Sequence, residues 1–128
     1  MRFPKWVFIV AGVWGLLVVP PLYVLFDTIG RQNPPGITHP EFYYGFAGVT
    51  LAWQFAFLVI ASNPIRYRPV MLPSIAEKFL YVAALVILFV QRRIPASLLA
   101  FGATDLTFGV LFVVAFLMTR ARPAPGRA

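Results

Sequence analysis

An almost uninterrupted apolar stretch occupies residues 98–118 and reads LLAFGATDLTFGVLFVVAFLM. An α-helix rises about 1.5 Å per residue, so about 20 apolar residues cross the hydrocarbon core of a bilayer, which is about 30 Å thick. Three more apolar runs precede this stretch, at residues 7–26, 42–61 and 75–90. The third run is shorter and reaches the required length with its polar ends. The pattern predicts an all-α integral membrane protein, a bundle of four transmembrane helices.

The composition agrees with this fold class and limits the chain to one small domain. Of its 128 residues 60% are hydrophobic, whereas soluble domains have about 45–50% apolar residues. We expect one transmembrane domain over residues 1–120, with helices at about 5–26, 42–62, 75–92 and 96–119. A basic, proline-rich cytoplasmic tail, residues 121–128, follows it.

The positive charge predicts an orientation in the membrane. The net charge is +7, and the basic residues are spread among helix ends instead of clustering on one face, so nucleic acid is not an expected partner. Three basic residues fall on one side, Arg31, Arg92 and Arg93; the other side has eight: Arg2, Lys5, Arg66, Arg68, Lys78, Arg120, Arg122 and Arg127. The positive-inside rule then places both termini in the cytoplasm, in a cell inner membrane.

Asp105 is the unusual residue of the chain, because it lies inside an apolar run. It is about ten residues, or about 15 Å, from the external end of its helix. A carboxyl group at this depth costs about 3 kcal/mol on an insertion scale, which the apolar neighbours offset. The best partner by depth is Gln54, which shares its helix face with Thr50. Together with the hydroxyls of Thr104 and Thr107, these side chains form either a site for a proton or a polar ligand, or a polar clasp between two helices.

Small residues indicate where helices approach each other closely. Gly48, Ala52 and Ala56 recur every four residues in the second run, and Gly102 and Gly109 share a face with Asp105. We expect these ladders to serve helix packing within the chain more than an intermolecular dimer. They also predict that Asp105 faces a packed neighbour instead of lipid.

The connections between the runs suggest three weaker sites. Residues 27–41 hold five glycines and prolines, which predicts an irregular external cap without a helix. In this cap His39 could bind a metal ion or act in acid–base chemistry with Asp27 and Glu41, although an exposed loop histidine explains it as well. We expect no other metal site.

On the cytoplasmic side, Ser74 and Glu77 have the spacing of a capping box, which predicts a helix start at Ser74. Arg66, Arg68 and Lys78 would then lie at the membrane surface, where they could bind a lipid headgroup. Alternatively, Glu77 pairs with Arg66 or Arg68 and holds the turn against the bundle.

The turn Asn63-Pro64-Ile65-Arg66-Tyr67-Arg68-Pro69 and the Glu77-Lys78 pair, together with the size and the four-helix plan, resemble small bacterial membrane proteins of the DoxX-like kind. The resemblance implies the fold and, because some of those proteins are linked to a quinone-coupled oxidoreductase, a quinone-reactive role. No catalytic motif of soluble enzymes is present, which favours a non-catalytic protein.

Two functions follow from these features. The first is an accessory subunit packed against other membrane subunits of a respiratory or photosynthetic complex, with no cofactor of its own and with contact to a quinone, pigment or lipid of that complex. The alternative is a small transporter, channel or quinone-reactive protein that uses Asp105. A membrane enzyme built on Asp27, His39 and Glu41 is a third class.

Overall fold

The computed structural model describes residues 2–32 and 36–120, and within these ranges all regular elements are helices. Four of them are long: α1 (Arg2–Val18), α3 (Pro40–Ser62), α4 (Met71–Val90) and α5 (Leu99–Met118). The short ones are η1 (Pro20–Tyr23), α2 (Phe26–Gln32), η2 (Arg68–Val70) and η3 (Ala96–Leu98). The predicted tail, residues 121–128, lies outside the described residues.

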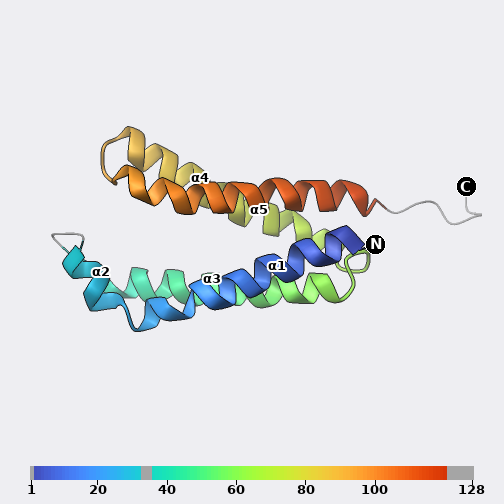
Figure 1. Cartoon of the computed structure of the whole chain (residues 1–128), viewed down its shortest axis with the longest axis horizontal. Coiled ribbons are helices and arrows are strands. Elements are labelled where there is room, and N and C mark those ends of the chain that lie inside the picture. The colour runs from blue at the N-terminus through green and yellow to red at the C-terminus, as the bar shows by residue number, and fades with distance from the viewer. Residues whose placement is uncertain (1, 33–35, 121–128) are drawn as a thin grey trace, which may run out of the picture.

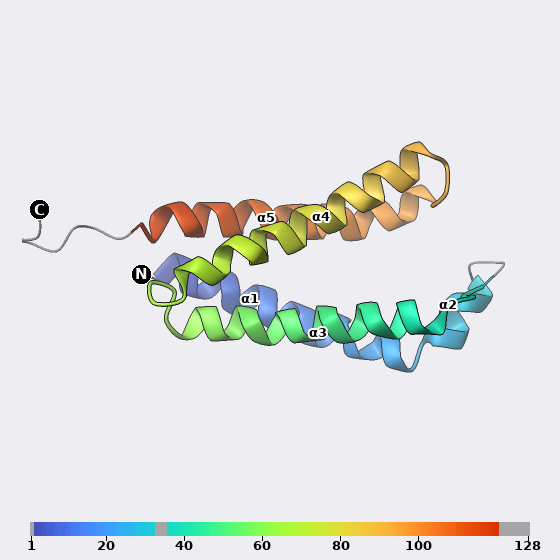
Figure 2. The ribbon, with the colours of Figure 1, turned by 180° about the vertical axis from the view of Figure 1, so that it is seen from behind.

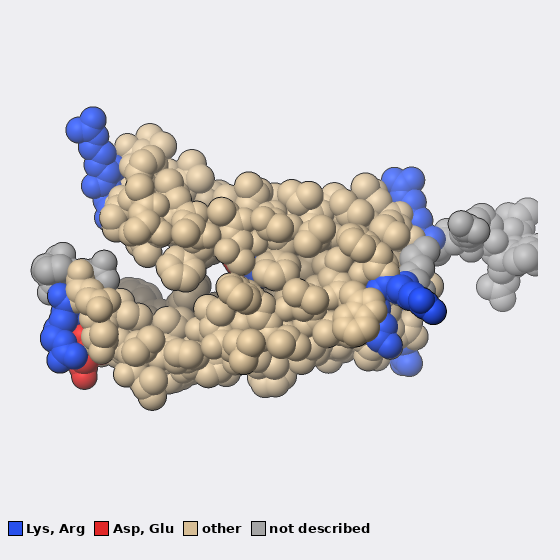
Figure 3. Space-filling model, in the orientation of Figure 1, with Lys and Arg blue, Asp and Glu red and all other residues tan. Residues whose placement is uncertain are grey.

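Four segments of 22 or 23 residues are long and apolar enough to cross a membrane: Arg2–Tyr23, Pro40–Ser62, Arg68–Val90 and Ala96–Met118. Figure 3 shows the lysine and arginine side chains at the two ends of the molecule, with a broad apolar band between them. This distribution suits a bilayer, whose core excludes charge and whose surfaces accept it. The expected class, an all-α bundle of four membrane-spanning helices, is confirmed.

The long helices form two hairpins that lie against each other (Figures 1 and 2). α1 packs on α3, α4 packs on α5, and the first half of α1 also contacts the second half of α5. α1 begins and α5 ends at the same end of the molecule, where residues 63–70 connect α3 to α4. α2 and the connection from α4 to α5 lie at the opposite end, and there the two hairpins diverge.

Three aromatic rings hold the hairpins together. Phe8 of α1 stacks on Phe112 of α5 with ring centroids 4.3 Å apart, and Phe57 of α3 meets Phe112 edge-on at 5.0 Å. All three side chains are fully buried. Such aromatic pairs contribute about 0.5–1.5 kcal/mol beyond the area that they bury. This cluster therefore fixes α1, α3 and α5 relative to one another.

Glycines set the spacing within each hairpin. A Cβ atom at Gly12 would lie 2.8 Å from the side chain of Leu58, and one at Gly15 would overlap the amide of Gln54, so α1 approaches α3 closely only without these atoms. In the other hairpin, Gly102 faces Leu85 and Gly109 faces the ring of Phe79 on α4. Close backbone approach through small residues is the usual way in which membrane helices gain van der Waals contact.

The predicted ladder on α3 is only partly used in this packing. Gly48 and Ala56 are half-buried, and Gly48 lies against the hydroxyl of Tyr23, but Ala52 is exposed. The glycines that bring α1 and α3 together belong to α1. Since both faces of a helix can carry small residues, sequence spacing alone does not say which face meets a neighbour.

Two features at the α2 end of the molecule differ from the expected ones. The first helix was expected to reach residue 26, but α1 ends at Val18 and the chain continues as a 3₁₀ turn at Pro20 and Pro21, which lack the N–H groups of an α-helix. The expectation of a cap without a helix is wrong, because α2 forms at Phe26–Gln32. The ring of Phe26 stacks on Tyr44 at 5.3 Å, and this contact docks α2 on α3.

The predicted capping box is also wrong. α4 begins at Met71 with Val70 as its N-cap, and the hydroxyl of Ser74 donates to the carbonyl oxygen of Val70 at 2.8 Å. Pro73 does not prevent this earlier start, because a proline in the first turn lacks only an N–H that has no helical partner there. Glu77 and Lys78 consequently lie nearly two turns inside the helix.

Candidate functional site: a buried ionic cluster between α4 and α5

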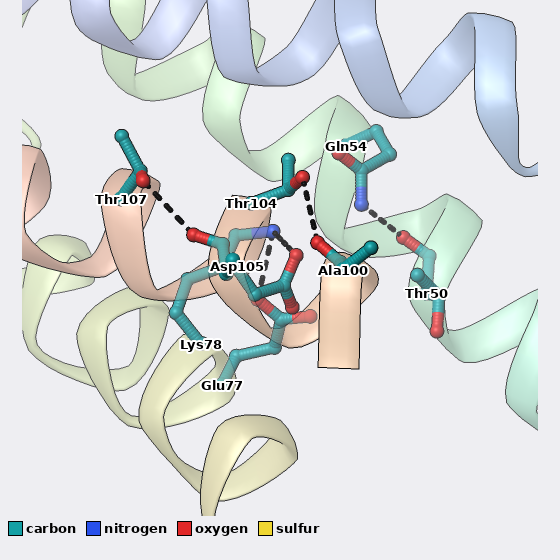
Figure 4. Close-up of polar contacts among 9 residues, drawn as sticks. Thr50, Gln54, Glu77, Lys78, Ala100, Thr104, Asp105 and Thr107 are labelled. Carbon is teal, nitrogen blue, oxygen red and sulfur yellow. Dashed lines mark hydrogen bonds and ion pairs between the residues drawn. The ribbon is translucent and has the colours of Figure 1, made fainter. Parts of the chain in front are cut away.

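Three ionisable side chains meet in the interior of the second hairpin (Figure 4). The ammonium nitrogen Nζ of Lys78 lies 3.5 Å from Oδ1 of Asp105 and 3.6 Å from Oε2 of Glu77. The side chain of Lys78 is only 6% exposed, that of Glu77 17% and that of Asp105 21%. We call these three residues the ionic cluster.

The cluster lies near the middle of two membrane-spanning segments. Lys78 is ten residues from the start of the Arg68–Val90 segment, which corresponds to about 15 Å along a helix. Asp105 is nine residues from the start of the Ala96–Met118 segment, or about 14 Å. Ionisable groups at such depth are costly and mark functional pathways or sites more often than other residues do.

The ammonium group is surrounded by aromatic faces as well as by carboxylates. Nζ of Lys78 lies 5.1 Å from the ring centroid of Phe57 on α3 and 5.7 Å from that of Phe108 on α5. A Cβ atom at Gly109 would lie 3.3 Å from Cβ of Lys78, so this glycine leaves room for the lysine between α4 and α5. Cation–π attraction strengthens when water is excluded, which helps to hold the charge at the centre of the bundle.

The charges of the cluster do not balance. Two carboxylates and one ammonium leave one negative charge when all three groups are ionised. Oε2 of Glu77 is buried and makes no hydrogen bond in the described structure, because Nζ of Lys78 lies beyond hydrogen-bond distance. A buried acceptor that makes an ion pair but no hydrogen bond is incompletely satisfied, and a buried net charge is more unfavourable still. A proton or another cation at Glu77 would remove both penalties.

A hollow between the hairpins leads toward the cluster. Figure 3 shows this hollow at the end where the hairpins diverge, with charged atoms visible at its inner end. The partial exposure of Asp105 and Glu77 agrees with such an opening. The two carboxylates are therefore partly accessible from the space between the hairpins.

The structure corrects the expected partner of Asp105. Gln54 is buried, but its amide nitrogen donates to the carbonyl oxygen of Thr50 at 2.8 Å, and its side chain lies against Gly15. The hydroxyls of Thr104 and Thr107 donate to carbonyl oxygens one turn earlier in α5, at 3.2 and 2.9 Å. Figure 4 shows that these side chains are separate from the ion pair. Of the predicted polar site, only Asp105 belongs to the ionic cluster.

The lipid-headgroup site expected at the turn between α3 and α4 also loses residues. Lys78 is buried, so its assignment to a lipid headgroup is wrong, and Glu77 pairs with Lys78 instead of Arg66 or Arg68. Nε of Arg68 donates to the carbonyl oxygen of Phe116 at 3.1 Å, and its guanidinium lies 3.7 Å from the ring centroid of the same residue. Arg68 thus secures the end of α5, and Arg66 remains exposed.

The signal that could have revealed Lys78 is its position between apolar residues, seven after Met71 and twelve before Val90. When Ser74 is taken as the start of the helix, Lys78 falls at the membrane surface. With the helix begun at Met71, a lysine and an aspartate at similar depth on consecutive helices predict an ion pair.

His39 lies apart from the ionic cluster. Its Nδ1 atom is 3.2 Å from Oε1 of Glu41, and both side chains are 66% exposed. Among residues 2–32 and 36–120, no group of three or more histidine, aspartate or glutamate side chains is placed to hold a metal ion. Comparison with protein-family models, curated proteins and solved structures finds no match to this chain.

Proposed function

We propose that the protein is a small membrane transporter or channel that binds and releases a proton at the ionic cluster. The observation that carries the proposal is the buried Oε2 atom of Glu77, which has no hydrogen bond and lies 3.6 Å from an ammonium group that also serves Asp105. A proton on Glu77 makes the cluster neutral, as burial in a membrane demands. Loss of that proton leaves a negative charge that attracts a cation.

The geometry supports exchange between two arrangements. Nζ of Lys78 is nearly equidistant from the two carboxylates, at 3.5 and 3.6 Å. A lysine side chain has a flexible stem and a compact charge, so it can follow whichever carboxylate is ionised. In this proposal, protons reach Glu77 and Asp105 through the hollow at the α2 end.

Infrared difference spectroscopy of the protein in vesicles tests proton binding directly. We expect a carbonyl band of a protonated carboxyl group that diminishes as the pH is raised, and we expect Glu77→Gln to remove it. Glu41→Gln is the matched control, because Glu41 is an exposed carboxylate outside the cluster. A spectrum without this band, or a band that survives in Glu77→Gln, would contradict the assignment.

Proton flux in the same vesicles tests the transport part. With an imposed membrane potential, we expect the wild-type protein to acidify or alkalise the lumen and Glu77→Gln and Asp105→Asn to lose this flux while remaining folded. If both variants lose thermal stability and the wild-type protein shows no flux, the cluster is a structural clasp.

We also propose an inner-membrane location with the N-terminus and the chain end after α5 on the cytoplasmic side. With Lys78 removed to the membrane interior, seven basic residues of the sequence remain on that side against Arg31, Arg92 and Arg93 on the other. The positive-inside rule supports this orientation. Labelling of single cysteines at residue 5 and residue 92 in intact cells tests it, and labelling of residue 5 alone would reverse it.

A second candidate, an accessory subunit of a larger membrane complex, has one supporting observation. The outer face of α3 is not covered by the residues that the structure describes: a Cβ atom built at Gly45 meets nothing within 4 Å outside its own stretch of helix, Ala52 is exposed, and Val49 is 62% exposed. Small residues on a free face allow another helix to approach. Ala52→Leu should then weaken co-purification of partner subunits, and unchanged co-purification would count against this candidate.

A further inference from the structure

The surface between α1 and α5 contains an apolar groove of about 220 Å³, lined by Phe3, Trp6, Val7, Val10, Phe108 and Leu111. The four residues from α1 recur at helical spacing and extend over seven residues, or about 10 Å along the helix axis. The groove is therefore an open apolar surface that follows α1 for about two turns, a length that a segment of hydrocarbon chain can occupy.

The end of the groove at Phe3 lies where positive charge gathers. Arg2 and Lys5 are exposed in the first turn of α1, at the same end of the helix as Phe3, and their long side chains can extend to the membrane surface from the neighbouring faces of the helix. Arg66 and Arg120 are also exposed at this end of the bundle, beyond the ends of α3 and α5. Figure 3 shows basic and no acidic side chains at this end.

The acidic residues of the chain lie elsewhere. All four of them belong to the described residues: Asp27 and Glu41 are near the opposite end, and Glu77 and Asp105 form the ionic cluster. Arg2 and Lys5 consequently have no carboxylate side chain of this chain to pair with. Basic residues near a membrane surface attract anionic headgroups, with about 1 kcal/mol for each lysine or arginine.

We propose that the groove is a binding site for an anionic phospholipid, whose acyl chain lies along Val7, Val10 and Leu111 and whose headgroup pairs with Arg2 and Lys5. Trp6 is 59% exposed at the rim, where an indole suits the boundary between headgroup and hydrocarbon. This site is separate from the ionic cluster and independent of the proposed transport.

Quenching of Trp6 by brominated lipids tests the proposal. Trp14 and Trp53 are replaced by phenylalanine, so that Trp6 is the only tryptophan, and circular dichroism verifies that this protein folds. In mixed vesicles, we expect brominated phosphatidylglycerol to quench Trp6 with an apparent affinity at least about fivefold above that of brominated phosphatidylcholine, the factor that one basic residue supplies near an anionic surface.

Two variants, each with a control, distinguish binding of the lipid headgroup from binding of the acyl chain. Arg2→Gln with Lys5→Gln should reduce the preference to about one, whereas Arg92→Gln with Arg93→Gln, at the opposite end, should leave it unchanged. Val10→Phe fills the groove and should lower quenching by both lipids, whereas Val13→Phe, on the exposed surface of α1 one turn further, should not. The proposal would be overturned if the two lipids quenched Trp6 equally in the protein whose groove and charges are unchanged. It would also be overturned if both pairs of arginine or lysine substitutions lowered the lipid preference equally.

Discussion

Nζ of Lys78 lies 3.5 Å from Oδ1 of Asp105, and this ion pair joins α4 to α5 near the middle of their apolar spans. Asp105 alone would be a costly intramembrane charge. Lys78 compensates that charge from the neighbouring helix and lies between the rings of Phe57 and Phe108. The pair is thus both the polar contact of the second hairpin and the centre of the proposed proton site.

We expect Lys78→Met to destabilise the protein more than Asp105→Asn does. Removal of the ammonium leaves two neighbouring carboxyl groups without a counter-charge, whereas Asp105→Asn leaves the Lys78–Glu77 pair. Breaking a buried ion pair costs about 3–5 kcal/mol. The measurement is the thermal midpoint in detergent, with Asp27→Asn as the exposed control. The double variant Lys78→Met, Asp105→Leu should lose less than the sum of its single variants, and strict additivity would refute the coupling.

Gly15→Ala should destabilise the contact between α1 and α3. The added Cβ atom would overlap the amide of Gln54, which is buried and cannot move into solvent. Overpacking of this kind costs about 1–3 kcal/mol. Gln54→Ala in the same protein makes room and should restore part of the thermal midpoint. Gly45→Ala is the control, because a Cβ atom there meets no atom within 4 Å; equal effects at the two glycines would contradict the packing argument.

Arg92→Gly should stabilise the end of α4. Arg92 has φ of 59°, and the N–H groups of Arg92 and Arg93 donate to the carbonyl oxygens of Phe89 and Leu88. These bonds form a Schellman motif, in which glycine is the usual residue with positive φ. The left-handed conformation costs a non-glycine residue about 1–2 kcal/mol, so we expect a gain of about 1 kcal/mol by reversible unfolding in mixed micelles. Arg93→Gly lacks this benefit, and a similar gain there would rule out relief of strain.

Arg68→Lys should lower stability although the charge is kept. The guanidinium donates to the carbonyl oxygen of Phe116 at 3.1 Å and covers the Phe116 ring at 3.7 Å, and an ammonium cannot make both contacts in one geometry. We expect a loss of about 1–2 kcal/mol in the same unfolding assay. Arg66→Lys is matched in chemistry but exposed, with its guanidinium 5.5 Å from the Tyr67 ring. An equal change in the free energy of unfolding for Arg68→Lys and Arg66→Lys would contradict this expectation.

The candidate site shows where reasoning from sequence succeeds and where it stops. Asp105 was recognisable as a site residue because a carboxylate inside an apolar run is unfavourable wherever the helix packs. The sequence offers two partners for it, because Gln54 and Lys78 lie at similar depth once α4 begins at Met71. The choice between them depends on rotation of the helices about their axes, which directs Gln54 toward Gly15 and Lys78 toward Asp105.

The class of the protein, the number of long helices and their approximate spans follow from the amino-acid sequence alone. These properties are local, since a bilayer requires about 20 apolar residues and satisfaction of every backbone hydrogen bond within each span. Three contacts became visible in the folded bundle: Gly12 and Gly15 bring α1 onto α3, Arg68 secures α5, and Lys78 meets Asp105. Those contacts join residues far apart in the chain, and they are selected by simultaneous packing of all four helices, which no local pattern encodes.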